Sequence, residues 1–497
     1  MTSASTADSQ SNVGSPEDHL ERAAIDRSTR LPVVFFLTSA VAWLGLSVVL
    51  GAIASIKQHS PGFLDWDWLA FLNFGRVHPA FMNAFIYGWC FQVGIGVALW
   101  IMARLCRVQL KNPITLIVAG HLWNLGVTLG VIGILAGYGY SLEFLEFPKF
   151  VWPILFISYT CIAVWMVVMF RVRKREEAYV AQWYIVAACF WFPWIYLTAN
   201  MIIHVMPVVG IMKDTAGVWY RSTLIYLFFI PLGLASSYFM IPKVIGRSIY
   251  SYSLSMVAFW TIAGVGAWTG LQRLLGGPLA PWMPAFSGGA AILMLIPVIA
   301  VGINHYMTVR GHHHLLNHSP TLRFTFAGAA GFSATCICGA FLALYSDRVS
   351  FTIAEDGFNL VALYSFFSTM MFGAIYFILP RVVGCEWLSR RMIQLHFWPT
   401  VYGSIVLAVW IIAGGIWEGI SLEAWDSDTI NASSTSTSFL VGKTVIWLLF
   451  VGPSTTIFIL HFLMMLLRLG RRTSEPTLLG HPEPGHGTQA VEGGAGA

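Results

Sequence analysis

The sequence has very little charge for its length. Only 10% of its 497 residues are Asp, Glu, Lys or Arg, whereas 57% are hydrophobic. A soluble globular protein of this size needs many more polar residues to cover its surface, so the composition excludes that class. The chain also lacks a nucleotide-binding loop, a soluble domain and a short-period repeat, and we expect no nucleic-acid partner. A polytopic membrane protein in a lipid bilayer is the class that remains.

Cysteine is scarce as well. Seven cysteines occur, almost all inside apolar runs. Cys336 and Cys338 are two residues apart, a spacing that puts their side chains on different faces of a helix. We therefore predict that the cysteines pack as small apolar side chains and form neither disulfides nor a metal site.

Long apolar runs, in contrast, are abundant. Twelve of them occur, each bounded by charge, proline or glycine, and each about 20 to 28 residues long, which is enough to cross a bilayer. The sequence therefore predicts an all-α membrane protein with twelve transmembrane helices. The runs are residues 31–56, 79–103, 113–137, 149–170, 183–206, 218–241, 252–271, 284–308, 324–345, 357–379, 392–417 and 440–467.

Lys and Arg are distributed unevenly between the segments that join these runs. If the amino terminus is cytoplasmic, about 20 of the 28 basic residues fall on the cytoplasmic side, and the segments on the other side are acidic. The positive-inside rule then places both termini in the cytoplasm. Residues 1–30 have no continuous apolar stretch, so we expect a polar cytoplasmic tail and not a cleaved signal peptide. Residues 31–470 form the membrane domain, and residues 471–497 are predicted to be a disordered cytoplasmic tail.

Several short motifs occur in order along the chain. They are FGRVHP (74–79), AYVAQW (178–183), IPK-x₃-GR-x-IYSYSLS-x-V-x-FW (241–260), GINHYMT (302–308), SPTLRF (319–324), FGAIYFILPR (372–381) and LHFW (395–398). Together they resemble subunit I of the cbb-type (C-family) haem–copper oxidases, and the resemblance covers roughly residues 65–425. It implies the twelve-helix cytochrome c oxidase subunit I bundle, a bacterial-type inner membrane, and cytochrome c-type or other oxidase-like membrane subunits as partners.

The resemblance also implies where cofactor ligands belong. The family uses six histidines, for two haems and one copper, and a tyrosine beside the copper. Imidazole suits these metals because its neutral nitrogen is available at neutral pH. None of the six is retained here, and Gly266 replaces the tyrosine. The six ligand positions hold Phe81, Ser222, Gln272, Arg273, Phe358 and Leu360, and residues 350–379 contain no histidine at all.

Other histidines remain candidates for a relocated haem ligand. His78 lies three residues before Phe81 on a similar helix face, and His204 lies at a similar depth. His121 is expected deeper in the third helix, and an intramembrane histidine is a functional candidate by default. Alternatively, each hydrogen-bonds a nearby carbonyl or lies in the headgroup region. The cluster of His312, His313, His314 and His318 is expected in a solvated loop rather than in a metal site.

Two arginines fall near the copper position of the family. Arg221 and Arg273 lie close to the outer ends of predicted membrane helices, where an unpaired guanidinium is costly. One hypothesis is that they replace the lost metal charge and pair with Glu355 or Asp356. The alternative is that both extend to the headgroup region.

Three functions from different classes are compatible with these observations. The first is a cofactor-free relative of oxidase subunit I, with no metal and no catalytic residue, that acts as a structural, assembly or regulatory component of a respiratory complex, or as a binding protein that uses the vacated cavity. The second is an active oxidase with haem b and copper that passes electrons from cytochrome c to oxygen and pumps protons. The ligand positions argue against the second, so enzyme activity is left undecided. The third is a channel or transporter that reuses the scaffold.

Overall fold

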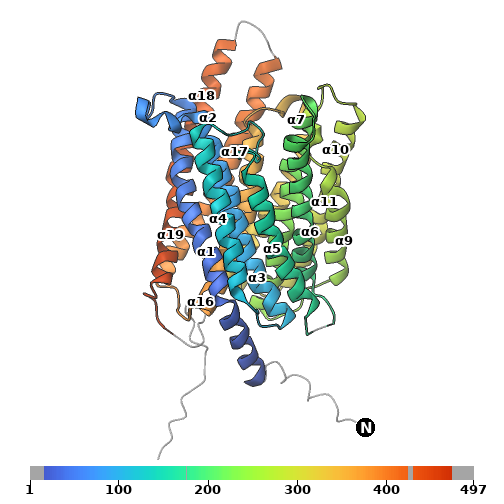
Figure 1. The fold of residues 1–497 in the computed structure, drawn as a ribbon, viewed down its shortest axis with the longest axis vertical. Helices are drawn as coiled ribbons and strands as arrows, with labels where there is room; N and C mark the ends of the chain where they lie inside the picture. Colours follow the sequence, from blue (N-terminus) through green and yellow to red (C-terminus); the bar gives the residue numbers. More distant parts are fainter. Residues whose placement is uncertain (1–15, 175, 424–428, 473–497) are drawn as a thin grey trace, which may run out of the picture.

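The computed structural model describes residues 16–174, 176–423 and 429–472, and in them twelve helical spans are long and apolar enough to cross a membrane. The predicted twelve-helix membrane fold is thereby confirmed. The spans stand side by side along one common direction (Figure 1). In chain order they are α1 (Pro16–His59); α2 (Phe74–Asn83), η2 (Ala84–Cys90) and α3 (Phe91–Cys106); α4 (Pro113–Ala136); α5 (Val151–Arg171); α6 (Val180–Asn200) and η3 (Met201–Val205); α7 (Ile211–Leu224), η4 (Ile225–Phe229) and α8 (Ile230–Ile245); α9 (Tyr252–Val265); α10 (Trp282–Leu293) and α11 (Leu295–Val309); α13 (Pro320–Leu344); α15 (Ala354–Leu360), η7 (Val361–Ser368) and α16 (Thr369–Val383); α17 (Arg390–Glu423); and α18 (Thr429–Ile446), η8 (Trp447–Val451) and α19 (Gly452–Leu466).

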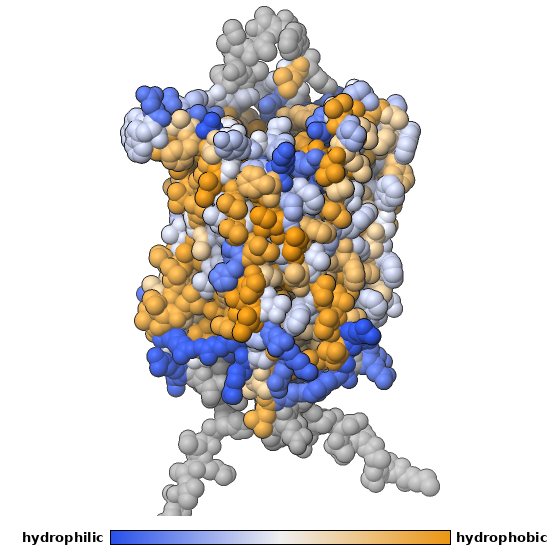
Figure 2. Space-filling view, in the orientation of Figure 1, coloured by the Kyte–Doolittle hydropathy of each residue, from blue (hydrophilic) through white to orange (hydrophobic). Residues whose placement is uncertain are grey.

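The surface of the bundle matches a bilayer. On the face drawn in Figure 2, apolar residues cover much of the middle, a polar rim lies at the lower end, and polar patches lie at the upper end. Large apolar side chains such as Trp260, Ile299 and Val409 are more than half exposed on the outside of the spans. Because every backbone group inside a helix is satisfied within that helix, such a surface can face lipid. We call the end that carries Glu143, Glu355 and Asp356 the acidic end, and the end that carries Arg104, Lys243 and Arg381 the basic end.

Three spans form the centre of the bundle. Between 94% and 100% of the most apolar window is buried in the second, sixth and tenth spans, against 33–50% in the other nine. Each of these three spans contains a π-helical segment near its middle, namely η2, η4 and η7. Such segments are rare and often mark functional sites, because the wider turn moves the flanking side chains to new faces.

Two of the central spans end in the same way at the basic end. In α8 and α16 a proline is followed four residues later by a glycine with positive φ, Gly246 and Gly384. The amide of each glycine donates to the carbonyl of that proline, Pro242 or Pro380. A glycine in the left-handed region is a common helix stop, since no Cβ opposes that conformation. The IPK and LPR motifs are therefore helix C-termini.

The boundaries of some elements differ from the prediction. Helix α1 begins at Pro16, so the predicted polar tail is helical from there. Ile25 is buried, and Asp26 accepts a hydrogen bond from Trp100, which ties this segment to α3. The seventh span was expected to be continuous, but α9 ends at Val265 and the chain turns at Gly270, where φ is +111°. The predicted disordered tail lies outside the described residues beyond residue 472.

The cysteines are all within the described residues. None of them forms a disulfide there, and five of the seven are buried. Cys161 is exposed on the outer surface of α5, and Cys338 is partly buried.

Candidate functional site

The six substituted ligand positions line two separate cavities in the central spans. Phe81 and Leu360 line a cavity of about 130 Å³, which we call the aromatic cavity. A second cavity of about 50 Å³, the charged cavity, is bounded by the other four positions, Ser222, Gln272, Arg273 and Phe358. Phe358 and Leu360 are two residues apart at the end of α15 and face one cavity each.

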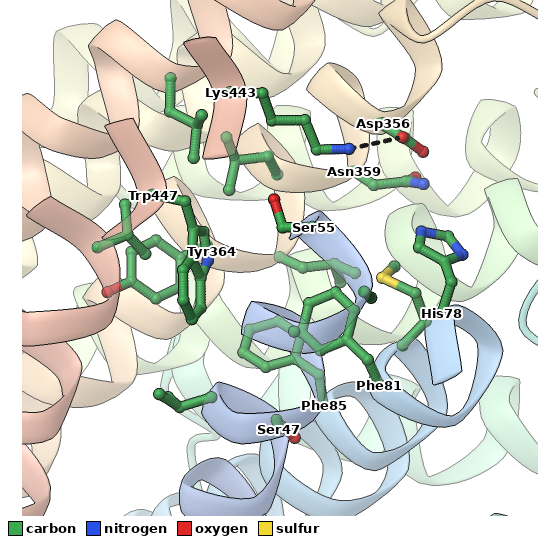
Figure 3. Close-up of a pocket in the computed structure, with 18 of the residues that line it drawn as sticks. Ser47, Ser55, His78, Phe81, Phe85, Asp356, Asn359, Tyr364, Lys443 and Trp447 are labelled. Atoms are coloured by element: carbon green, nitrogen blue, oxygen red, sulfur yellow. Dashed lines mark hydrogen bonds and ion pairs between the residues drawn. The ribbon is translucent and has the colours of Figure 1, made fainter. Parts of the chain in front are cut away.

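Aromatic side chains form one wall of the aromatic cavity. The rings of Phe81 and Phe85 lie 6.3 Å apart, and Phe85 lies 6.4 Å from Tyr364. Trp447 of η8 also lines this cavity (Figure 3). On the side of α1, a Cβ placed on Gly51 would lie 2.9 Å from the Phe81 ring. Phe81 thus packs directly against the backbone of α1.

Polar side chains gather at the acidic end of the aromatic cavity. The ammonium of Lys443 donates to Gln58 at 2.7 Å and lies 3.4 Å from a carboxylate oxygen of Asp356. His78 lines the same end, as Figure 3 shows. Within the part of the chain that the structure describes, neither ring nitrogen of His78 has a hydrogen-bond partner. The cavity therefore combines apolar walls with one cap of hydrogen-bonding groups.

In the charged cavity, hydrogen bonds within the protein engage the substituted side chains. The Ser222 hydroxyl lies 2.8 Å from that of Thr269. The Gln272 carbonyl accepts from the amide of Gly270 at 2.8 Å and from Ser287 at 2.7 Å. These bonds hold the turn after α9 against α7 and α10.

Four charged side chains form a cluster at the mouth of the charged cavity. Arg221 lies 2.8 Å from Glu143 and 3.0 Å from Glu355. Arg273 donates to Glu355 through Nε at 2.5 Å, contacts it again through Nη2, and lies 3.7 Å from Glu143. The Arg221 side chain is only 5% exposed. Two guanidinium groups and two carboxylates thus balance one another in a buried setting, which is the arrangement that buried charges require. We call these four residues the ion-pair cluster.

The ion-pair cluster differs in part from what the sequence suggested. Both arginines form ion pairs with Glu355, as one of the two hypotheses proposed. Asp356 does not join them. It is the next residue of α15, about 100° further around the helix, and it pairs with Lys443 in the aromatic cavity. Glu143 was not anticipated as a partner. It comes from the segment 137–150, and the only available signal was its place in an acidic segment at the same end.

Asn359 links the two cavities. Its side-chain carbonyl accepts from Arg221 at 3.0 Å, and its amide donates to Glu143 at 2.8 Å. The same side chain also lines the aromatic cavity.

The histidines proposed as relocated ligands do not come together. His78 lines the aromatic cavity, whereas His121 and His204 line neither of the two cavities described above. His121 is exposed on the outer face of α4, where its ring contacts Phe35 at 4.7 Å. His204 ends α6 in η3 and its ring lies 4.8 Å from Tyr140. The similar depth of His78 and His204 was therefore a poor guide, since their helices do not turn the two side chains toward one cavity. His312, His313, His314 and His318 lie in the α11–α13 connection, mostly exposed.

The residues present do not fit the haem and copper groups of the resemblance. A cavity of about 150 Å³ holds one benzene ring, so the aromatic cavity lacks room for the four pyrrole rings of a porphyrin. Its only imidazole is His78, and Met82, one turn further along α2, cannot reach the opposite face of an iron. The charged cavity offers a hydroxyl, an amide and guanidinium groups, and a permanent cation repels a metal. In addition, a Cβ on Gly266 would lie 3.0 Å from Leu227, which leaves no space for a tyrosine.

A buried carboxyl lies beside the ion-pair cluster. Glu146, in the segment between α4 and α5, is 6% exposed and accepts a hydrogen bond of 2.7 Å from Asn83. Burial raises the pKa of Glu146 from 4.5 to about 8, since the charged form loses its hydration. At neutral pH this group therefore holds a proton for most of the time.

Comparisons with known proteins point in one direction. The model of the family described as "Cytochrome C and Quinol oxidase polypeptide I" matches residues 32–440. The chain is 26% identical over 411 residues to the Cbb3-type cytochrome c oxidase subunit CcoN1 of Stutzerimonas stutzeri, and the match covers 79% of this chain and 84% of that protein. It is 26% identical over 416 residues to the "Cytochrome c oxidase subunit 1 homolog, bacteroid" of Bradyrhizobium diazoefficiens, covering 80% and 74%. A cytochrome c oxidase subunit 1 homolog of Agrobacterium tumefaciens is 23% identical over 422 residues, covering 80% and 75%.

Proposed function

Because this chain belongs to the cytochrome c and quinol oxidase polypeptide I family, we propose that it serves in a respiratory membrane complex as a subunit I-like component without haem or copper. In this role it is structural, regulatory or needed for assembly, and it transfers no electrons itself.

The observation that carries the proposal is the ion-pair cluster. Arg221 and Arg273 bring two permanent positive charges to the place where the resemblance puts a copper ion, and Glu143 and Glu355 balance them. A metal ion there would have to displace or coexist with two guanidinium groups, at a large electrostatic cost. The cluster also joins four segments of chain, so it supplies a link that a metal would otherwise provide.

The names of the relatives support the rest of the proposal. They are cytochrome c oxidase subunits or homologues of them, so membrane subunits of the same kind of complex, including cytochrome c-type subunits, are the expected partners. A bacterial-type inner membrane with both termini in the cytoplasm is the expected setting, because the basic end then faces the cytoplasm.

A spectrum and a metal analysis test the absence of cofactors. The chain is purified in mild detergent from its native membrane, its visible spectrum is recorded oxidised and reduced, and iron and copper are measured per chain. A haem-containing oxidase prepared in parallel is the positive control. We expect no Soret band and no stoichiometric iron or copper; a Soret band in proportion to the chain would overturn the proposal and favour the oxidase alternative.

A deletion tests the role in a complex. Removal of the gene from the host should lower the amount of an assembled respiratory complex on native gels, and the intact gene should restore it. Unchanged complexes, together with solute flux in proteoliposomes that contain the pure chain, would instead favour a channel or transporter.

A further inference from the structure

We propose that the aromatic cavity is a binding site for one hydroxylated aromatic ring, that is, for a phenol. The side chains of Phe81, Tyr364 and Trp447 all line this cavity, whose volume is about 130 Å³. The inference goes beyond the proposed function and depends on it in one respect only, since a porphyrin in this place would exclude the ring.

The size of the cavity sets the size of the ligand. Its volume of about 130 Å³ is close to the roughly 150 Å³ of an apolar cavity known to take up benzene. One six-membered ring with a small substituent therefore fits, whereas two fused rings or a porphyrin do not.

The walls favour a flat aromatic ligand. Phe81 and Phe85 present their rings from the end of α2 and from η2, and Tyr364 and Trp447 present theirs from η7 and η8 (Figure 3). Aromatic rings gain from offset-stacked or edge-to-face contacts with each other beyond the burial of area. The Tyr364 hydroxyl is already bound to Thr455 at 2.7 Å, so this wall offers its ring and not its polar atom.

The polar cap favours a neutral hydroxyl. Lys443 and Asp356 are 3.4 Å apart, which is longer than the 2.7–2.9 Å usual for a charge-assisted hydrogen bond, so both retain capacity for another partner. A hydroxyl can accept from the ammonium and donate to the carboxylate at once. An anion would face Asp356 and a cation would face Lys443, so the pair selects against both. The ring nitrogens of His78 are available as a further partner.

Equilibrium dialysis with radiolabelled phenol tests the site. The full chain in detergent is dialysed against phenol, and the uptake by micelles alone is subtracted. We expect saturable binding of one phenol per chain, and benzene should compete about tenfold more weakly, because it lacks the hydrogen bonds to the charged pair.

Two variants and one control make the outcome specific. Lys443→Met removes the ammonium and should weaken phenol binding about tenfold. Leu360→Trp fills the cavity and should abolish binding. Lys213→Met changes a partly exposed lysine of α7 that lines neither cavity, and it should leave the affinity unchanged. Size-exclusion chromatography and circular dichroism establish that each variant is folded. If Leu360→Trp is not folded, Lys443→Met alone decides.

The outcomes separate this proposal from the previous one. Binding that is not saturable, or that Lys443→Met and Leu360→Trp leave unchanged, would overturn the phenol site and would not affect the proposed loss of cofactors. A Soret band in the same sample would defeat the proposed function and the phenol site together.

A phenol with a long 4-alkyl chain distinguishes two sources of ligand. Tighter binding than phenol indicates a ring carried by a membrane lipid, and weaker binding indicates a free small molecule. Either result supports a phenol site.

Discussion

Nη1 of Arg221 lies 3.0 Å from a carboxylate oxygen of Glu355, and Arg273 contacts the same carboxylate. One acid on α15 thus holds two guanidinium groups from α7 and from the turn after α9. Removal of a single partner from such a buried set leaves an unbalanced charge, which costs more than the set contributes as a whole.

Substitution of Glu355 by Ala is therefore expected to destabilise the fold strongly. The change leaves Arg221 and Arg273 with Glu143 alone, and loss of one partner of a buried ion pair costs about 3–5 kcal/mol. The free energy of unfolding in detergent is the measurement. Asp347→Asn, at a mostly exposed acid of the same end, is the matched control and should change it by less than about 0.5 kcal/mol. Equal effects of the two changes would contradict a central role for the ion-pair cluster.

The contact between Phe81 and Gly51 is testable by a pair of substitutions. Gly51→Ala puts a methyl group 2.9 Å from the Phe81 ring and should lower the free energy of unfolding by about 1–3 kcal/mol. Phe81→Leu removes the obstructing part of the ring, so Gly51→Ala should cost much less in that background. Thermal denaturation of the four proteins measures the coupling. Strictly additive effects would show that Phe81 does not pack against α1.

Glu146 makes the stability depend on pH. Its pKa is raised from 4.5 to about 8 in the fold, so the fold prefers the protonated carboxyl. As the pH rises through 4.5, the unfolded chain releases this proton while the folded chain keeps it, and stability falls by about 1.4 kcal/mol per pH unit until the folded group ionises near pH 8. Above pH 8 the contribution is constant.

The control is the isosteric amide. Glu146→Gln keeps the shape and cannot ionise, so the stability of this variant should change less between pH 5 and about pH 8 than that of the native chain. Unfolding free energies at a series of pH values are the measurement. Parallel curves for the two proteins would assign the pH dependence to other groups.

The GINHYMT motif has a structural reason that can be tested. The Asn304 amide donates to the carbonyl of Ser251 at 2.8 Å and to the Ser255 hydroxyl at 3.0 Å, and its carbonyl accepts from the Ser251 amide at 3.0 Å. Asn304→Ala removes these three hydrogen bonds and leaves the Ser251 amide without its acceptor, whereas the Ser255 hydroxyl still donates to the Ser251 carbonyl at 3.0 Å. The variant should therefore lose about 2–4 kcal/mol of stability. Asn317→Ala, at an exposed position, should be close to neutral. A near-neutral Asn304→Ala would contradict this assignment.

The number of spans was predictable because apolar run length is a local property of the sequence. Every run from 31–56 to 440–467 corresponds to a span, since each had to cover about 30 Å of hydrocarbon. The start of α1 at Pro16 was not predictable in the same way. Residues 16–30 are too polar to signal a membrane helix, and the contact of Asp26 with Trp100 that supports the helix there is long-range.

The candidate site was only partly predictable. The spacing of the motifs placed Phe81, Ser222 and Phe358 at ligand positions, and these residues do line cavities. Two of the ion pairs, Arg221–Glu143 and Lys443–Asp356, could not be predicted from the sequence, because the partners of each pair lie far apart along the chain. The prediction that these histidines could act together as ligands failed for a related reason. The depth of a residue in the membrane follows from its position in the sequence, whereas the direction of its side chain depends on how each helix is rotated in the bundle.

The π-helical segments η2, η4 and η7 divide each central span into two halves. Because one residue corresponds to about 100° around a helix, a residue gained or lost at such a segment would rotate one half against the other without disturbing either one's internal register. The halves at the acidic end hold four of the six substituted ligand positions, namely Phe81, Ser222, Phe358 and Leu360, and those at the basic end of α8 and α16 hold the IPK and LPR helix stops. Substitutions could therefore accumulate in the halves at the acidic end while the halves at the basic end kept their original packing.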